Sequence, residues 1–245
     1  MNLVVDIGNT QIKLAWFEQG RLIESIRTEE GRWDDVAMLI KEKPASHVIV
    51  SSVNQTYDPV ARALNNLKTE ILVLDHKTPL PVEVSYSTPE TLGHDRIAAA
   101  AGASYVCPFC NVLIMDMGTA ITIDFLSSEG KFMGGNISPG LQTRFRALNE
   151  FTAKLPLVAK DSGFPAFGTD TRTAIVAGVQ QGIIYELNSY ISDFTRQYPA
   201  CEFIITGGDA GFFVSRLNRS VFTIPDLVLK GLNYILEFNL SGGKP

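Results

Sequence analysis

The sequence predicts an α/β protein made of two similar lobes, each built on a mixed β-sheet and facing the other across a cleft. Apolar segments of strand length alternate with segments of helical periodicity along the chain. The opening segment recurs, in pattern, 110 residues later. The 245 residues are enough for two small domains with buried cores, and we expect these domains at residues 1–108 and 109–245.

The recurrence aligns residues 3–22, LVVDIGNTQIKLAWFEQGRL, with residues 113–132, LIMDMGTAITIDFLSSEGKF, without a gap. Asp6 thereby falls on Asp116. In both copies a strand ends in Asp-x-Gly and small polar residues, and a second strand, a glycine turn and a third strand follow, as in β-hairpins. The second strand excludes the dinucleotide-binding fold, in which the glycine loop opens a helix.

The alternation continues after each triplet of strands. In the first half, periodicity predicts helices over residues 33–40, 58–68 and 89–106, and strands over residues 47–53 and 71–76. In the second half it predicts a mostly helical segment over 169–198, a strand over 202–206, a helix after Gly207-Gly208-Asp209 and a closing helix over 225–239. No low-complexity linker is present, so the boundary is expected near residues 107–112.

Two such β-β-β-α-β-α-β-α units resemble the acetate and sugar kinase, heat-shock ATPase and actin superfamily. The resemblance implies two duplicated ribonuclease-H-like lobes whose mixed sheets face a nucleotide cleft. A single Asp-x-Gly turn also occurs at ordinary strand ends, but two copies in register favour the nucleotide interpretation.

Composition narrows the functional classes. Apolar residues make up 45% and charged residues 19% of the chain, and the net charge is −5, which argues against a general nucleic-acid or anionic-membrane surface. No apolar stretch approaches the roughly 20 residues of a membrane span. The N-terminus lacks the features of a secretory signal. We therefore expect a cytoplasmic protein.

The three cysteines do not form a disulfide framework. Cys107 and Cys110 form a CxxC pair, but it follows an alanine-rich helical stretch and precedes a strand, the reverse of a thioredoxin motif. Cys201 stands alone and the three histidines do not cluster, so a loop is favoured over a redox or zinc role.

The segment DIGNTQIK carries the residue types that a triphosphate site requires. Gly8 lets the backbone approach a phosphate, and Asn9 and Thr10 offer hydrogen-bond donors. Lys13 returns to the same end of the hairpin as a point charge. Asp6 is a hard oxygen ligand for Mg²⁺.

Asp116 is the matching carboxylate of the second half and a candidate Mg²⁺ ligand by the same argument. Thr119, Thr122 and Asp124 follow it, the last two on one face of a strand. The alternative for this face is a solvent-exposed strand surface.

The segment Gly93-His94-Asp95-Arg96 precedes an alanine-rich helix. Asp95 could accept a proton from a substrate hydroxyl, and Arg96 could hold a substrate carboxylate through paired hydrogen bonds. The alternative is an ordinary carboxylate in the first turn of a helix.

Two further stretches are rich in glycine. We expect residues 134–140, GGNISPG, to form a tight functional loop. Residues 206–210, TGGDA, join a strand to a helix, where backbone amides could meet a nucleotide; the alternative is a simple turn with an aspartate cap.

These motifs together resemble the type III pantothenate kinase family over essentially the whole chain. The family pattern DxGNTxxK appears at residues 6–13, GxDR at 93–96, DxGTA at 116–120, GGxxxPG at 134–140 and TGGDA at 206–210. The resemblance implies ATP-dependent phosphorylation of pantothenate to 4′-phosphopantothenate, the first step of coenzyme A biosynthesis, with ATP, Mg²⁺ and a monovalent cation (K⁺ or NH₄⁺) as cofactors.

The resemblance also implies roles for individual residues. Asp95 would be the catalytic proton acceptor. ATP would be bound by Asp6, Ile7, Gly8, Asn9, Thr10, Gln11, Ile12 and Lys13, and by Thr119. Pantothenate would be bound by Tyr86, Gly93, His94, Asp95 and Arg96, although His94 occupies a variable position and receives no individual role.

Three points concern metal and subunits. The family assigns Asp116 to the monovalent cation, whereas the duplication suggests Mg²⁺, and we prefer the family assignment. The family's substrate threonine maps to Thr171, where Asp170 replaces the usual asparagine. Because that threonine comes from the neighbouring subunit, the resemblance implies a homodimer.

Two rival functions remain open at this stage. A nucleotide-binding switch or regulatory factor could use the same fold without an acceptor substrate, but it would need neither Asp95 nor Arg96. Another small-molecule kinase or a polyphosphate-handling hydrolase of the superfamily would differ in its acceptor.

Overall fold

The computed structural model describes the chain except residues 9–10, 30, 53–61, 63, 65–68 and 244–245. Its contacts divide the chain into two compact units. The first comprises Met1–Pro108, Gly130–Phe132 and Leu227–Pro245, and the second comprises Phe109–Glu129 and Met133–Asp226. The closing helix, expected in the second lobe, therefore packs within the first unit.

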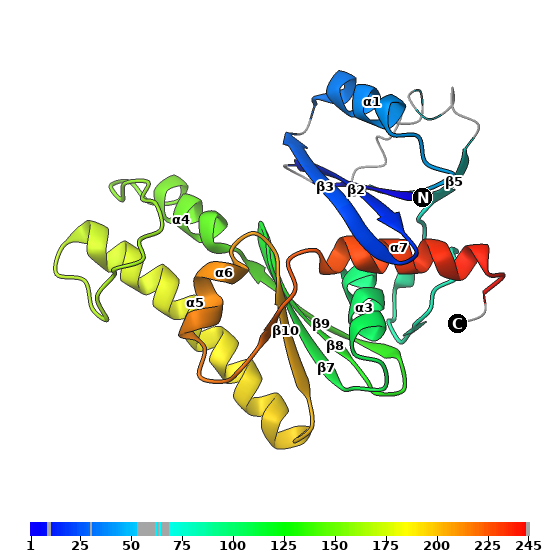
Figure 1. Cartoon of the computed structure of the whole chain (residues 1–245). Helices are drawn as coiled ribbons and strands as arrows, with labels where there is room; N and C mark the ends of the chain where they lie inside the picture. The colour runs from blue at the N-terminus through cyan, green and yellow to red at the C-terminus, as the bar shows by residue number, and fades with distance from the viewer. Residues whose placement is uncertain (9–10, 30, 53–61, 63, 65–68, 244–245) are drawn as a thin grey trace. The chain divides into compact units, whose positions relative to one another are not determined.

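The first unit is built on a five-stranded mixed sheet with the strand order β3-β2-β1-β4-β5 (Figure 1). The strands are β1 (Asn2–Ile7), β2 (Gln11–Glu18), β3 (Arg21–Glu29), β4 (His47–Ser52) and β5 (Glu70–Val73). β1 lies at the centre, antiparallel to β2 and parallel to β4. Its apolar run suits this place, because a central strand is covered on both faces. β3 is an edge strand whose residues alternate between exposed and half-buried.

Helices cover both faces of this sheet. α1 (Trp33–Glu42) buries Val36 and Ile40 in a core that includes Leu3, Val5 and Trp16. α7 (Leu227–Leu240) contacts β1 and β4 and packs along α3 (His94–Val106). A short strand, β6 (Glu83–Val84), and a 3₁₀ turn, η1 (Pro89–Thr91), precede α3.

α3 and α7 approach each other through glycines. A Cβ on Gly231 would lie 1.7 Å from the Ala98 carbonyl oxygen, and one on Gly102 would lie 2.4 Å from the Leu227 carbonyl oxygen. Backbone contact at this distance requires residues without side chains. The alanine-rich sequence of α3 is thus explained by close helix packing.

The second unit repeats the arrangement, with neighbouring strands in the order β11-β10-β7-β8-β9. Its strands are β7 (Val112–Met117), β8 (Ala120–Leu126), β9 (Lys131–Pro139), β10 (Glu202–Thr206) and β11 (Phe222–Thr223). β9 continues from the first unit, where its opening residues Lys131 and Phe132 pair with β6. Its helices are α4 (Leu141–Glu150), α5 (Thr171–Gln197), α6 (Ala210–Phe213) and the 3₁₀ turn η2 (Val214–Arg216). α5 lies beside this sheet (Figure 1). Its residues Ile183 and Leu187 belong to one core with Leu113 and Ile123 of the sheet.

The two units confirm the predicted duplication, with one correction to the gapless alignment. β7 and β9 begin and end 110 residues after β1 and β3. However, Asp6 stands opposite Lys13, whereas Asp116 stands opposite Thr122. The second hairpin turn is therefore one residue shorter, and Thr122 is the structural counterpart of Lys13.

Several other expectations need correction. The helix expected over residues 89–106 is interrupted, because the Gly93 backbone is not helical (φ −58°, ψ 133°) and α3 begins at His94. Residues 134–139 belong to β9 and are not a loop. α4, β6 and β11 were not predicted, and the helix expected over 58–68 falls mainly outside the described residues. Cys107 and Cys110 lie between α3 and β7, as expected for a loop.

Gly231→Ala should lower the free energy of unfolding by about 2–3 kcal/mol, because the added methyl group overlaps the α3 backbone. Gly178→Ala in α5 is the matched control, since no described atom beyond the helix's own nearby backbone lies within 4 Å of its Cβ position and alanine favours a helix interior by about 0.5–1 kcal/mol. Urea unfolding of both variants measures the effect. A Gly231→Ala protein as stable as the wild type would contradict the proposed packing.

Candidate active site

Asp6 is a buried carboxylate at the end of the central strand of the first unit. Its side chain is held between β2 and β4, where Lys13 and Ser51 stand opposite it in register. Lys13 Nζ lies 3.4 Å from Asp6 Oδ2, and the Ser51 side chain also hydrogen-bonds to the carboxylate. Only 6% of Asp6 is exposed.

Burial raises the pKa of Asp6, although the Lys13 charge and the hydrogen bonds act in the opposite direction. The negative charge of Asp95 adds to the rise, so the two carboxylates lie within electrostatic range of each other. One lysine therefore does not compensate the desolvation of Asp6. Such a carboxylate favours a second positive charge, and Mg²⁺ commonly takes one or two carboxylates together with phosphate oxygens and water.

Between Asp6 and Lys13, the structure describes Ile7, Gly8, Gln11 and Ile12. The Gly8 backbone N–H donates to the Gln11 carbonyl oxygen at 3.0 Å. The side chains of Ile7 and Ile12 are buried in the core, so only their backbone groups are available to a ligand. The predicted donors Asn9 and Thr10 lie outside the described residues.

The second motif of the first unit opens α3. Asp95 is exposed in the first turn, where its Oδ1 accepts a hydrogen bond from the Arg96 backbone N–H at 2.9 Å. Arg96 is 5% exposed, and its guanidinium carbon lies 5.7 Å from the Tyr86 ring centroid and 5.6 Å from that of Phe132. Stacking against aromatic rings orients a guanidinium group. The structure thus brings together Tyr86, Asp95 and Arg96, which the sequence analysis grouped as substrate residues.

His94 lies beside these residues, with part of its ring buried. Its Nδ1 atom is buried and has no hydrogen-bond partner among the described residues. Burial lowers the pKa of His94, and the nearby charges of Asp95 and Asp75 oppose this effect without cancelling it. The His94 imidazole is therefore neutral at pH 7.

In the second unit, three motifs that are far apart in sequence converge on the end of β7. Asp116 is half-buried there, and a Cβ on Gly207 would lie 2.4 Å from its Oδ1. The backbone at Gly207 has φ +90°, a conformation that glycine adopts readily. The Thr119 carbonyl oxygen accepts hydrogen bonds from the Gly140 backbone N–H at 2.9 Å and from Thr143 Oγ1 at 2.7 Å.

Two alternatives from the sequence are wrong. Asp124 has no exposed surface, so its strand face is not a solvent-exposed one. The Asp209 side chain makes no capping hydrogen bond to α6; its carboxylate instead pairs with Lys160 at 2.8 Å.

Gly135 allows β9 to pack against β8. A Cβ at this position would lie 2.1 Å from the Ile123 carbonyl oxygen.

Thr171 is exposed at the first position of α5. The preceding Asp170 caps the helix, with Oδ1 accepting from the Thr173 backbone N–H at 3.0 Å. The hydrogen bonds from Thr173 lower the pKa of Asp170. An aspartate here supplies the cap that an asparagine would also supply.

Three residues that belong to none of the predicted motifs contact the motif residues: Thr143, Lys160 and Ser51. Thr143 had a signal, because Leu141, Phe145 and Leu148 follow Pro139-Gly140 at helical spacing. Lys160 and Ser51 contact their partners only through tertiary structure.

Among the described residues, no three His, Cys, Asp or Glu side chains lie close enough together to hold a metal ion. In the same part of the chain, no helix is long and apolar enough to cross a membrane.

Comparisons with known proteins agree with the motifs. The sequence model of the type III pantothenate kinase family matches residues 2–193. Curated relatives of that name are 43% identical over 239 residues in Phocaeicola vulgatus and 41% identical over 240 residues in Cytophaga hutchinsonii. These alignments cover 98% of this chain and 99% and 100% of the relatives, respectively.

Solved structures confirm the fold class. A Campylobacter jejuni protein, described as a candidate Baf family transcriptional activator, has a TM-score of 0.66 at 23% identity, covering 98% of this chain and 99% of that one. A ROK family glucokinase from Streptomyces griseus, in complex with glucose and AMPPNP, has a TM-score of 0.52 at 13% identity, covering 97% and 98%. At these identities the likeness concerns the fold alone.

The lowered pKa of His94 predicts a pH-dependent stability. Below the ordinary pKa of about 6.5 the unfolded chain takes up a proton that the folded protein resists, so stability falls as the pH drops from about 6.5 through the lowered pKa. His94→Gln should flatten this part of the profile. Urea unfolding at several pH values between 5 and 7.5 tests it, and an unchanged slope in the variant would assign the dependence to other groups.

Proposed function

The chain belongs to the type III pantothenate kinase family, and on this premise we propose how its residues divide the work of the reaction. The enzyme phosphorylates pantothenate with ATP to give 4′-phosphopantothenate and ADP, a step of coenzyme A biosynthesis. The observation that carries the proposal is the proximity of Asp6, Lys13 and Asp95 in one unit. The proposed phosphate-binding residues Asp6 and Lys13 therefore lie in the same unit as Asp95, the candidate base.

ATP binding is assigned to the hairpin from Asp6 to Lys13 and to Thr119. Lys13 supplies a positive charge for the phosphates, and the Gly8 turn lets backbone approach them. The raised pKa of Asp6 supports a Mg²⁺ ligand at this position. Mg²⁺ bound with ATP would neutralise charge that develops on the phosphoryl oxygens.

Asp95 is the proposed general base. The pantothenate hydroxyl oxygen forms a bond to the γ-phosphorus while the bond from that phosphorus to the β,γ-bridging oxygen breaks and ADP leaves. The hydroxyl proton passes to the Asp95 carboxylate. Exposure of Asp95 at the start of α3 leaves it accessible to a substrate, and its position near Asp6 places it near the proposed phosphate site.

Pantothenate binding is assigned to Tyr86 and to Gly93–Arg96. The Arg96 guanidinium, oriented by aromatic rings, suits the planar carboxylate of pantothenate through paired hydrogen bonds. We further propose that Thr171 contacts pantothenate from a neighbouring subunit, in a homodimer. The basis for this is the family resemblance, and the capped start of α5 presents Thr171 at the surface.

Asp116 is the proposed ligand of the monovalent cation, K⁺ or NH₄⁺. The support comes from strand register: where β2 places the positive Lys13 opposite Asp6, β8 places the neutral Thr122 opposite Asp116. A cation at Asp116 would supply a positive charge where the first unit has a lysine. For location we propose the cytoplasm, because the chain has an odd number of cysteines without the spacing of a disulfide framework.

The direct test of function is ADP release by the purified protein with MgATP, with and without pantothenate, in potassium and in sodium buffer. We expect release that requires pantothenate and is faster in potassium. Release that ignores pantothenate would instead favour a hydrolase or a nucleotide switch. A pantothenate requirement without any cation effect would retain the kinase and remove the cation role of Asp116.

Asp95→Asn should lower kcat at least about 100-fold, because the amide cannot accept the substrate proton. The affinity for MgATP should change by no more than about threefold, since the variant retains the shape of the side chain. Glu90→Gln in the preceding η1 turn removes an equal charge from an exposed position and serves as the control. Turnover of Asp95→Asn at the wild-type rate would disprove the assignment of the base.

A further inference from the structure

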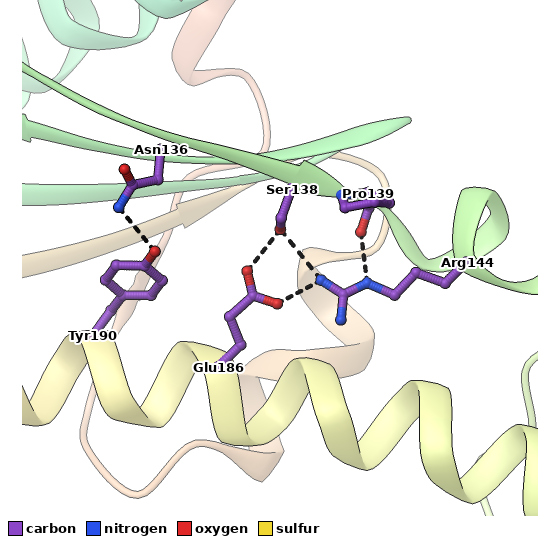
Figure 2. A network of polar contacts seen from close by, with 6 residues as sticks. All are labelled: Asn136, Ser138, Pro139, Arg144, Glu186 and Tyr190. Carbon is purple, nitrogen blue, oxygen red and sulfur yellow. Dashed lines mark hydrogen bonds and ion pairs between the residues drawn. The ribbon is translucent and has the colours of Figure 1, made fainter. Parts of the chain in front are cut away.

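A polar cluster in the second unit ties the end of β9 to α5 and α4, as Figure 2 shows. Arg144 Nη2 donates to Glu186 Oε2 at 2.5 Å and to Ser138 Oγ at 3.2 Å. Arg144 Nε donates to the Pro139 carbonyl oxygen at 2.7 Å, and Ser138 Oγ donates to Glu186 Oε1 at 2.6 Å. The side chains of Arg144 and Glu186 are only 22% and 23% exposed, so this ion pair is partly shielded from solvent.

A second contact one helical turn away reinforces the cluster. Asn136 Nδ2 donates to the Tyr190 hydroxyl at 2.8 Å (Figure 2). Asn136 and Ser138 are two residues apart on β9, and Glu186 and Tyr190 are four apart on α5, so each pair shares one face of its element. The long helix α5 thus holds β9 at two successive turns.

The segment where β9 ends and α4 begins, here called the β9–α4 corner (Pro139–Leu141), also contacts the turn that contains Thr119. α4 begins directly after Gly140, whose backbone N–H donates to the Thr119 carbonyl oxygen at 2.9 Å. Thr143 Oγ1 donates to the same oxygen at 2.7 Å. A Cβ on Gly140 would lie 2.2 Å from the Gly118 carbonyl oxygen, so the corner and the turn are in direct backbone contact.

We propose that Thr143 and the Arg144–Glu186 ion pair are positioning residues for nucleotide binding. The three side chains fix the Thr119 peptide by anchoring the β9–α4 corner to α5, and they act through Thr119 rather than on the substrate itself. The inference rests on the proposed contact between Thr119 and ATP. Thr119 is exposed, and a turn fixed in advance spares ATP the entropic cost of ordering it.

The geometry requires arginine specifically. The guanidinium group reaches a carboxylate, a hydroxyl and a backbone carbonyl at once through its planar fork. A lysine carries the same charge but presents it as a single point. Arg144→Lys therefore separates the anchoring geometry from net charge.

The test compares the KM for ATP with the KM for pantothenate in four variants. Thr143→Val and Arg144→Lys should each raise the KM for ATP about fivefold, the effect of losing roughly one net hydrogen bond, while the KM for pantothenate stays unchanged. Thr143→Ser should restore the wild-type value, because it keeps the hydroxyl. Arg146→Lys, an exposed position on the same helix, should change neither constant.

Thr119→Ala separates failure of this inference from failure of the proposed function. If Thr119→Ala weakens ATP binding while folded Thr143→Val and Arg144→Lys bind ATP as the wild type does, the positioning role is disproved and the ATP contact stands. If Thr119→Ala leaves ATP affinity unchanged, the premise fails and the inference fails with it. An equal rise of both KM values would indicate a general structural defect and would also overturn the proposal.

Discussion

The site in the first unit depends on one constraint, a carboxylate buried at the end of the central strand of a sheet. Because β1 is paired on both sides, the backbone of Asp6 cannot move to relieve the burial of its side chain. The pairing of β1 with β2 and β4 also brings Lys13 and Ser51 opposite Asp6. At the start of α3, the negative charge of Asp95 contributes to the raised pKa of Asp6. The second unit repeats the arrangement at Asp116, with Thr122 and Thr206 opposite in register. In register, the two strand ends differ in charge, because Lys13 stands opposite Asp6 and the neutral Thr122 stands opposite Asp116.

The glycines of the motifs allow close packing of the backbone. Gly207 lets the turn after β10 lie against Asp116, and Gly140 lets the start of α4 lie against the turn after β7. Gly135 allows β9 to lie close to β8. In each case a side chain would overlap backbone or carboxylate atoms, so these glycines bring distant segments to one place. The spacing of motifs in the sequence is thus set partly by the fold.

Much of the fold followed from the sequence because strand and helix periodicity and an internal repeat are local signals. The triplets of strands, α1, α5 and α7 were predicted within a few residues. α4 was not predicted because the glycine-rich stretch before it favours a loop, although that stretch forms the end of β9. The two-residue strands β6 and β11 carry no periodicity. Contacts such as Lys160 with Asp209, 49 residues apart, depend on tertiary packing.

For the candidate site, the sequence predicted which residue types take part but not their surroundings. The burial of Asp6, the aromatic rings beside Arg96 and the hydrogen bonds to the Thr119 carbonyl oxygen all depend on the tertiary structure.

We propose that Asp6 is kept buried for nucleotide binding rather than for stability. Because the folded pKa of Asp6 lies above its ordinary value, ionisation of Asp6 costs stability as the pH rises through that pKa. The most direct measurement is the unfolding free energy and the MgATP affinity of Asp6→Asn at pH 7, side by side with the wild type. We predict a variant at least as stable as the wild type whose MgATP affinity falls at least about tenfold, since the amide cannot supply the negative charge for Mg²⁺. A variant that loses stability, or binds MgATP as tightly as the wild type, would contradict this account.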